Sequence, residues 1–188
     1  MINILLSKMS RIFIALTPNL ELNKTISDLK KNQQKFLSKN AKVNWSNDQQ
    51  HHITLNFMGS MEPEQKKELY SFLDERPVFK ELPIEISNLS YFPKENGQVL
   101  VANVVLSPRL QKLFNEVDKI VARIGFGMSL RSFRPHITLA RFKEKNRPFS
   151  ELIELDEGIS SVVNTLDVYE STFNSSETLH TLIKSYLL

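Results

Sequence analysis

The sequence predicts an α+β fold, because strand-like and helix-like segments are interspersed while several neighbouring strands are joined by connections short enough for hairpins. A second observation is a repeated tetrapeptide. His-Ile-Thr-Leu occurs at residues 52–55 and again at residues 136–139, both times in a strand-like segment. The order strand, helix, His-Ile-Thr-Leu strand in the first half is partly echoed in the second half, which indicates a diverged internal duplication.

The elements of the first half follow from hydrophobic spacing and helix signals. A short apolar run at 11–16 predicts a buried strand, and Thr17-Pro18 ends it and opens a helix with a loose apolar face. That face comprises Leu22, Ile26, Leu29, Phe36 and Leu37. Residues 51–58 predict the next strand, ended by Gly59, and residues 62–75 predict a helix with a proline in its first turn.

The second half begins with two strands and a helix. Alternation over 82–92 changes phase between Ile86 and Leu89, which predicts a β-bulge, and residues 94–97 form a turn. The apolar run at 98–106 is typical of a strand covered on both faces. Residues 108–124 predict a helix with Ser107 as N-cap and Gly125 as its stop. The expected remainder is a strand at 133–142, irregular structure at 143–158, one strand at 160–172 and a last strand at 179–188.

Length and composition limit the class of protein. A chain of 188 residues fits one domain, or one domain with two lobes, and we expect residues 9–188 to form it. Residues 1–8 are expected to be an N-terminal extension without function, since Met9 would be a natural start. The absence of cysteine removes disulfides, thiol catalysis and thiolate metal sites, and it suits a cytoplasmic protein. No apolar run is long enough to cross a bilayer, so no membrane association is expected.

The basic residues are unevenly spread, although the formal net charge is only +3. Between residues 123 and 147 the only acidic residue is Glu144, whereas the basic residues are Arg123, Arg131, Arg134, Arg141, Lys143, Lys145 and Arg147. A basic stretch around one copy of the tetrapeptide favours an anionic ligand, with phosphate the usual candidate. The alternative is a solvated charged surface.

The repeated tetrapeptide carries the predicted chemistry. Because alternate side chains of a strand share a face, His52, Thr54 and Asn56 are expected on one face, with Ile53, Leu55 and Phe57 on the core side. The second copy likewise groups His136, Thr138 and Ala140. If the strands lie together, two imidazoles can serve as general acid and general base at one phosphorus atom, while the hydroxyls donate to its oxygens. Such a site needs no metal and no cofactor.

Other interpretations stay open at this point. A histidine beside a hydroxyl on a strand is commonly a satisfied polar residue with no chemistry, although two identical copies make that interpretation weaker. A zinc site would need about three protein ligands, and no carboxylate accompanies either copy. Serine-type catalysis is disfavoured, because the sequence has no nucleophile elbow.

The paired motifs resemble the 2H phosphoesterase superfamily, and within it the RNA 2′,3′-cyclic phosphodiesterases, also called 2′-5′ RNA ligases. The resemblance runs from about residue 11 to the C-terminus through "RIFIAL", "HHITLNFMG", "FRPHITLAR" and "DVYEST". It implies a bilobal fold with two pseudo-symmetric lobes of antiparallel sheet plus helices around a central cleft, and one motif from each lobe.

The resemblance also implies roles for single residues. His52 and His136 would be the catalytic acid/base pair, and Thr54 and Thr138 would bind the substrate phosphate. Arg141 matches a position where relatives carry a phosphate-binding arginine, although strand alternation would place it on the core side unless a bulge intervenes.

Three further positions are less specific. Phe57 is the corresponding residue in the first motif and could either stack on a base or pack in the core, and Arg134 could reach the substrate backbone or remain at the surface. His51 should face away from His52. His180 stands near a position where many relatives have tyrosine, and no catalytic role is expected for it.

The reaction implied is metal-independent hydrolysis of a terminal RNA 2′,3′-cyclic phosphate to a 2′-phosphate. The same attack by a 5′-hydroxyl RNA in place of water would give a 2′-5′ linkage, in a reversible ligation. The partner implied is RNA with a cyclic phosphate end, tRNA fragments among the candidates, bound by a monomer. The alternatives are a phosphodiesterase for 2′,5′-linked oligonucleotides or small cyclic nucleotide phosphates, and a non-catalytic RNA-binding module.

Overall fold

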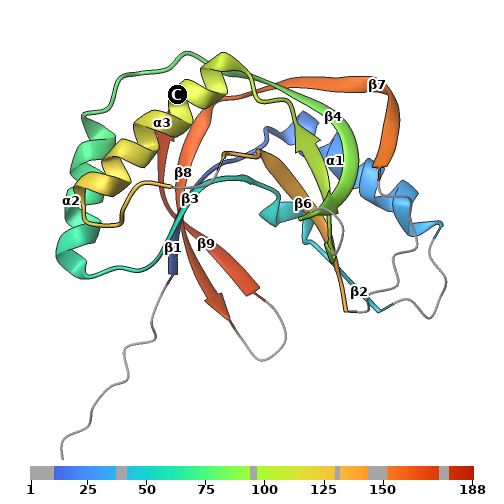
Figure 1. The fold of residues 1–188 in the computed structure, drawn as a ribbon, viewed down its shortest axis with the longest axis horizontal. Helices are drawn as coiled ribbons and strands as arrows, with labels where there is room; N and C mark the ends of the chain where they lie inside the picture. Colours follow the sequence, from blue (N-terminus) through green and yellow to red (C-terminus); the bar gives the residue numbers. More distant parts are fainter. Residues whose placement is uncertain (1–10, 37–41, 94–96, 130–131, 144–151, 174–177) are drawn as a thin grey trace, which may run out of the picture.

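The two tetrapeptides lie on strands that meet in the middle of one sheet (Figure 1). The computed structural model describes residues 11–36, 42–93, 97–129, 132–143, 152–173 and 178–188. Within these residues the strands form a nine-stranded sheet in the order β7-β4-β5-β6-β3-β1-β8-β9, with β2 paired to β6. All of the pairings are antiparallel, so the α+β prediction is confirmed. The predicted N-terminal extension, residues 1–8, lies outside the described residues.

The sheet divides into two half-sheets, which we call the first and second lobes. The first lobe contains β3 (Ile53–Ser60), β1 (Arg11–Leu16), β8 (Thr165–Phe173) and β9 (Thr178–Leu187). The second lobe contains β6 (His136–Phe142), β5 (Val99–Val104), β4 (Leu82–Phe92), β7 (Leu152–Val163) and β2 (Val43–Trp45). The lobes join between β3 and β6, where the one residue pair among the described residues is Ile53 with Ile137.

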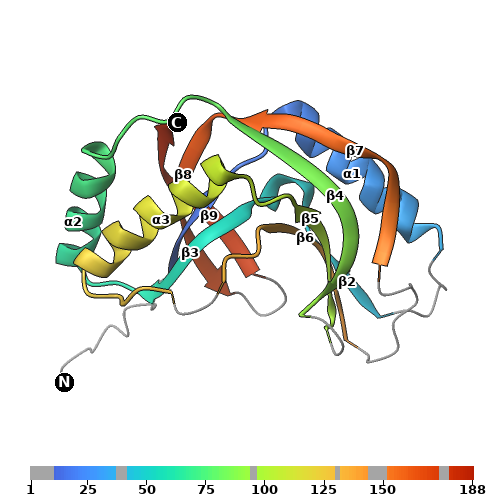
Figure 2. The same cartoon turned by 45° about the horizontal axis from the view of Figure 1, so that its top comes forward.

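One helix crosses between the lobes in each direction (Figure 2). Helix α1 (Leu20–Gln34) follows β1 but crosses to the second lobe, where the Asn19 side-chain amide donates to the Val162 carbonyl at 3.0 Å. Helix α3 (Pro108–Arg123) follows β5 and packs on β3 of the first lobe, with α2 (Pro63–Asp74) beside it. The arrangement β1-α1-β3 is therefore repeated as β5-α3-β6, which supports the predicted internal duplication.

The helices begin where the sequence supplies caps. Asn19 Oδ1 accepts from the Leu22 amide at 2.8 Å, and Ser107 Oγ accepts from the Leu110 amide at 3.2 Å. The apolar face of α3 is buried as expected, and it shares one core with both half-sheets. The predicted bulge in β4 is present between Ile86 and Asn88.

Three expectations about elements were wrong. Residues 143–158 were expected to be irregular, but β7 already begins at Leu152, and residues 144–151 lie outside the described residues. The single strand expected at 160–172 is two strands, because the chain leaves β4 of the second lobe and joins β1 of the first lobe at Asn164. Alternation cannot reveal such a change of partner. Phe36, expected on the apolar side of the first helix, lies beyond α1 and is 75% exposed.

Two short elements had no signal in the sequence. They are β2 and the 3₁₀ turn η1 (Asp48–Gln50), each three residues long, which connect α1 to the first motif. The turn at 94–97 falls mostly on residues 94–96, which lie outside the described residues, as does Leu37.

Candidate active site

Both motif strands contain a bulge at the leucine of the tetrapeptide. In β3, Thr54 pairs with Ala15 and Asn56 with Ile14, so Leu55 is left out of the register. In β6, Thr138 pairs with Val101 and Ala140 with the neighbouring Leu100, so Leu139 is left out of the register in the same way. A bulge inserts one residue and reverses the alternation beyond it. The two strands therefore deviate from regular alternation at equivalent positions.

These bulges correct the predicted faces. Phe57 is not a core residue: it is 56% exposed and lines the cleft between the lobes, while the Asn56 amide turns away to donate to Asp118 of α3 at 3.0 Å. In β6 the bulge buries Ala140 and directs Arg141 into the cleft. A phosphate-binding role for Arg141 required a bulge to turn its side chain away from the core, and that bulge is present.

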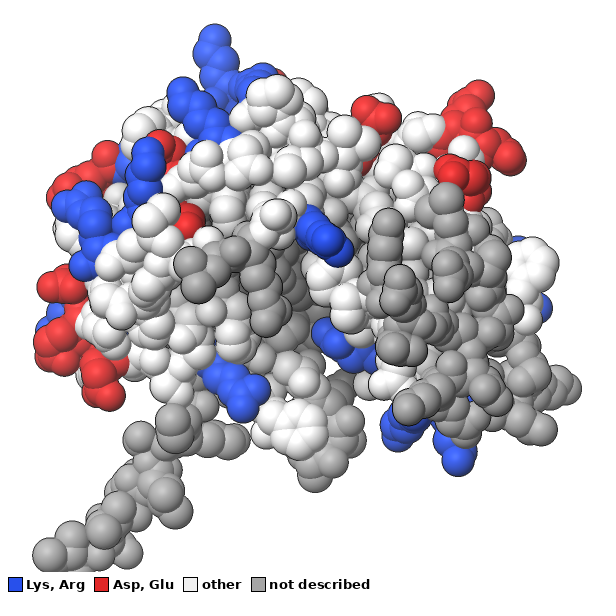
Figure 3. Space-filling model, viewed as in Figure 1, with Lys and Arg blue, Asp and Glu red and all other residues white. Residues whose placement is uncertain are grey.

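The cleft has a volume of about 570 Å³ and receives side chains from both lobes. The described residues that line it include no aspartate and no glutamate: Arg11, Phe13, Asn44, Trp45, Ser46, Asn47, Gln50, His52, Thr54, Phe57, His136, Thr138, Arg141, Ser171, Thr178 and His180. In Figure 3 the acidic side chains lie toward the left and right ends of the visible face, and its middle carries uncharged and basic groups. The cleft is therefore suited to an anion.

The two motif histidines are held by equivalent hydrogen bonds. His52 Nδ1 donates to the Gln50 carbonyl at 2.7 Å, and His136 Nδ1 donates to the Arg134 carbonyl at 2.8 Å. In each case the acceptor is two residues before the histidine. Because a carbonyl can only accept, each Nδ1 carries a proton and each Nε2 of the neutral ring keeps its lone pair.

Burial lowers the pKa of both rings. For His52 the pKa falls to about 4, mainly through burial, against the opposing hydrogen bond to the Gln50 carbonyl; repulsion from Arg141 and from the charged forms of His180 and His136 lowers it further. Burial also lowers the pKa of His136, and Arg141 lowers it further. In the free protein both imidazoles are therefore neutral at pH 7.

Each motif histidine also rests on an aromatic ring. Phe13 of β1 lies 5.0 Å from His52, centroid to centroid, and Phe92 of β4 stacks on His136 at 4.5 Å with an interplanar angle of 25°. Such contacts restrict ring rotation and exclude water from one face. Neither partner could be identified from the sequence, because each phenylalanine sits in an ordinary apolar strand pattern.

The junction between the lobes fixes the order of groups across the cleft. Since Ile53 pairs with Ile137 in antiparallel register, His52 comes opposite Thr138, and Thr54 comes opposite His136. In this register each imidazole is opposite the hydroxyl of the other motif. A local two-fold axis at the junction relates the two histidine–threonine pairs.

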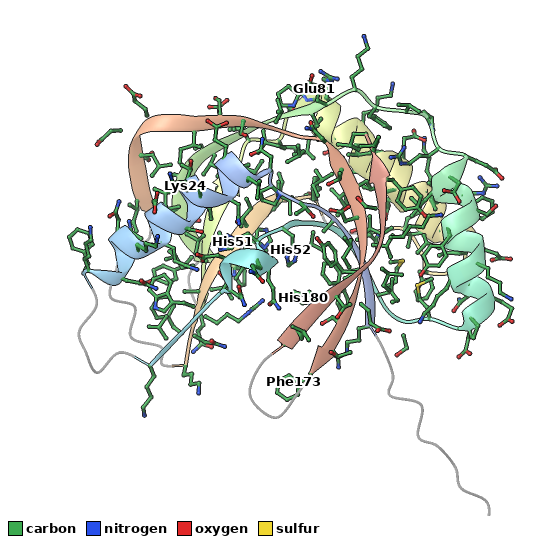
Figure 4. All side chains as sticks on the ribbon, turned by 180° about the vertical axis from the view of Figure 1, so that it is seen from behind. Lys24, His51, His52, Glu81, Phe173 and His180 are labelled. Carbon is green, nitrogen blue, oxygen red and sulfur yellow. The ribbon has the colours of Figure 1, made fainter. Side chains whose placement is uncertain are left out.

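His51 lies on the other side of the chain, as expected. It is 3% exposed, and its Nδ1 donates to Asn23 Oδ1 of α1 at 2.8 Å. Figure 4 shows His51 on the side of α1, and His52 next to His180. Burial lowers the pKa of His51 to about 4, with nearby Lys30 adding to the effect. Its place is in the interior and not in the cleft.

The segment before His52 is tied to both the helix and the second motif. Lys30 of α1 donates to the Ser46 carbonyl at 2.6 Å and also bonds Asp48. The Ser46 amide donates to the carbonyl of the bulged Leu139 at 2.9 Å. These contacts position Gln50, whose carbonyl in turn orients His52.

Sequence comparison places the chain in a family. The sequence model of the AKAP7 2′5′ RNA ligase-like domain matches residues 13–182, a span that contains both motifs. The chain belongs to the AKAP7 2′5′ RNA ligase-like domain family. This agrees with the resemblance to 2H phosphoesterases that the paired motifs indicate.

Curated relatives agree with this family assignment. An RNA 2′,3′-cyclic phosphodiesterase of Thermotoga maritima is 26% identical over 177 residues, covering 92% of each chain. A protein of the same name from Methanocaldococcus jannaschii is 23% identical over 141 residues, or 72% of this chain and 79% of the relative.

Two crystal structures share the fold. One is TT0787 of Thermus thermophilus, with a TM-score of 0.80 and 18% identity over 95% of this chain and 97% of that one. The other is LigT of E. coli complexed with 3′-AMP, with a TM-score of 0.75 and 23% identity over 95% and 98%.

Within this RNA ligase-like domain, most of the predicted site residues come together. His52, Thr54, Phe57, His136, Thr138 and Arg141 all line the cleft. Arg134 does not: its exposed side chain lies outside the lining, and its carbonyl holds His136. The basic stretch does not form one patch, because Arg123 lies 3.9 Å over the Phe72 ring on α2, outside the cleft lining.

The sequence motifs did not place His180 in the site, although the structure puts it in the cleft lining. It lines the cleft from β9, with its ring edge-on to His52 at 5.3 Å between centroids. The sequence TLH at 178–180, with threonine and histidine two residues apart on a strand, carried a weak signal for this position.

Two features are absent from the part of the chain that the structure describes. No group of three or more histidine, cysteine, aspartate or glutamate side chains there is arranged to hold a metal ion. No helix in the same part of the chain is long and apolar enough to cross a membrane.

Proposed function

We propose that this chain is an RNA 2′,3′-cyclic phosphodiesterase that opens a terminal cyclic phosphate to a 2′-phosphate. The observation that carries the proposal is the convergence of both His-Ile-Thr-Leu motifs, together with Arg141, on one cleft whose described lining contains no carboxylate. Family membership and the names of the curated relatives support the same reaction.

In this proposal the cyclic phosphate sits between the two motifs. The Thr54 and Thr138 hydroxyls donate to its non-bridging oxygens, and Arg141 offsets the charge that builds on them in the transition state. The proposal takes the two Nε2 atoms to lie on opposite sides of the phosphorus, and the cross-lobe order of imidazoles and hydroxyls supports this. In-line attack needs that arrangement, since the nucleophile enters opposite the leaving group.

His52 and His136 transfer the protons. One neutral imidazole accepts a proton from water as the water oxygen attacks phosphorus, and the other, protonated, donates to the departing 3′-oxygen. Both pKa values are lowered in the free protein, so the acid must gain its proton as the anion binds. An adjacent negative charge favours the protonated ring. With the 5′-hydroxyl of an RNA in place of water, the same step would join the two ends through a 2′-5′ linkage and free the 3′-hydroxyl, and the two histidines exchange roles when that linkage is cleaved back to the cyclic phosphate.

The alternatives use the same cleft. Hydrolysis of 2′,5′-linked oligonucleotides or small cyclic nucleotide phosphates would need the same acid/base pair and a different lining around the base. A binding module without turnover would not need two neutral imidazoles with unprotonated Nε2 atoms.

The test is incubation of an RNA bearing a 2′,3′-cyclic phosphate, in EDTA, followed by phosphatase. Conversion of the end to a phosphatase-labile monoester is expected with the wild type, and replacement of His52 or His136 by alanine should slow it at least about 10²-fold. His51→Gln is the matched control, since His51 is buried away from the cleft. Activity lost on chelation, or equal damage from His51→Gln and His52→Ala, would contradict the proposal.

We further propose a monomer that acts on RNA ends, tRNA fragments among them, in the cytoplasm. Both motifs come from one chain, and the sequence contains no cysteine. Arg141 and the histidines provide charge and hydrogen bonds for the RNA end, and Phe57 provides an exposed ring for stacking a base.

A further inference from the structure

A row of polar side chains crosses the first lobe beside the motif histidines. Arg11 of β1 pairs with Ser171 of β8, and Ser171 pairs with His180 of β9. Residues paired across antiparallel strands share a face, and all three line the cleft. The row therefore presents a guanidinium, a hydroxyl and an imidazole side by side, and none of the three belongs to either tetrapeptide.

His180 connects this row to the reacting groups. Its ring is edge-on to His52 at 5.3 Å and to Phe13 at 4.9 Å between centroids. Its Nδ1 is buried and has no hydrogen-bond partner among the described residues. Burial lowers the pKa of His180, with Arg141 adding to the effect, so the neutral ring offers one N–H donor at pH 7.

We propose that Arg11, Ser171 and His180 form a second phosphate subsite, which binds the phosphodiester on the 5′ side of the terminal nucleotide. This inference rests on the proposed function, because it takes the reacting phosphate to lie between His52 and His136. An RNA end differs from a free nucleoside cyclic phosphate by that next phosphodiester. The row would make the protein selective for chain ends over mononucleotides.

The chemistry of the row fits a phosphodiester. A guanidinium and a hydroxyl are both among the groups that commonly contact nucleic-acid phosphates. The described residues of the cleft contain no carboxylate that would repel the anion. The ring of His180, at one end of the row, lies 5.3 Å from the ring of His52, centroid to centroid. One nucleotide can therefore reach from the proposed phosphate subsite to the reacting phosphate.

The experiment compares two substrates that differ by one phosphodiester. One is adenosine 2′,3′-cyclic phosphate, and the other is the same compound with a methyl phosphodiester on its 5′-oxygen. In the wild type, kcat/KM should be at least about tenfold higher for the compound with the 5′ phosphodiester. The compound without it cannot make the charged hydrogen bond with Arg11. The ratio should fall to about twofold or less in Arg11→Met and Ser171→Ala, with Arg11→Lys in between.

A matched control is Arg109→Met, an exposed arginine on α3 outside the cleft lining, which should retain the wild-type ratio. Binding of the two corresponding 2′-phosphate products gives the same comparison without turnover. It can be followed by fluorescence of Trp45, the single tryptophan of the chain and part of the cleft lining.

The outcomes separate the two proposals. If neither cyclic phosphate is hydrolysed, the proposed function fails, and the binding ratio still tests the subsite. A wild-type ratio near one, or a ratio kept in both Arg11→Met and Ser171→Ala, overturns the second subsite while leaving the first site intact.

Discussion

Ile53 and Ile137 pair with each other where the two half-sheets meet, and each stands between the histidine and the threonine of its motif. Through this pair the register of one motif fixes the position of the other. Both isoleucine side chains are fully buried, so the junction is anchored by the core. The polar residues on either side of each isoleucine are thereby held at the surface of a single cleft.

The first prediction concerns the tautomers. In the free protein at pH 7, both His52 and His136 should be neutral with the proton on Nδ1, because each Nδ1 donates to a backbone carbonyl. His52 should remain neutral until its pKa of about 4 is approached. Nitrogen NMR of histidine-labelled protein measures both properties. A proton on Nε2 of either ring, or a charged His52 at pH 6, would contradict the geometry.

The second prediction concerns Arg141. Arg141→Met should lower kcat by about 10²-fold, since it removes a donor at the developing phosphate charge. Arg141→Lys should recover only part of this loss, because an ammonium lacks the planar fork. The pKa values of His52 and His136 should rise in Arg141→Met, as Arg141 lowers both in the wild type. Steady-state kinetics across pH test both effects, and unchanged kcat would exclude Arg141 from the reaction.

The third prediction concerns His51 and stability. Its pKa is about 4 in the folded protein and 6.5 in the reference state, so between these values the unfolded chain binds more protons. The free energy of unfolding should therefore fall as pH drops from 6.5 to 4, and His51 accounts for on the order of 3 kcal/mol of that fall. His51→Gln should show a smaller fall. Denaturant titrations at pH 7 and pH 4.5 give the difference, and an equal fall in both proteins would refute the assignment.

Much of the fold could be predicted from local patterns. The caps of α3, the phase shift in β4 and the paired tetrapeptides each appear as short-range signals in the sequence. The division of 160–172 into β7 and β8 could not, because the change of partner strand at Asn164 leaves the alternation unbroken.

The site shows the same contrast between local and long-range information. His52 and His136 were identifiable because their motifs repeat, whereas Phe57 was placed wrongly by simple alternation across a bulge. His180 and Phe92 reach the motif histidines from strands distant in the sequence. Their contacts depend on tertiary packing, which no local pattern encodes.

The central claim is that both motifs act on one phosphate. The most direct measurement is a phosphorus NMR spectrum of an RNA dinucleotide with a 2′,3′-cyclic phosphate, recorded during incubation with the protein in EDTA. The account predicts that the cyclic phosphate signal is replaced by that of a 2′-monophosphate, and that His52→Ala and His136→Ala each slow the change about 10²-fold or more. A 3′-monophosphate product, or full activity in either variant, would contradict it.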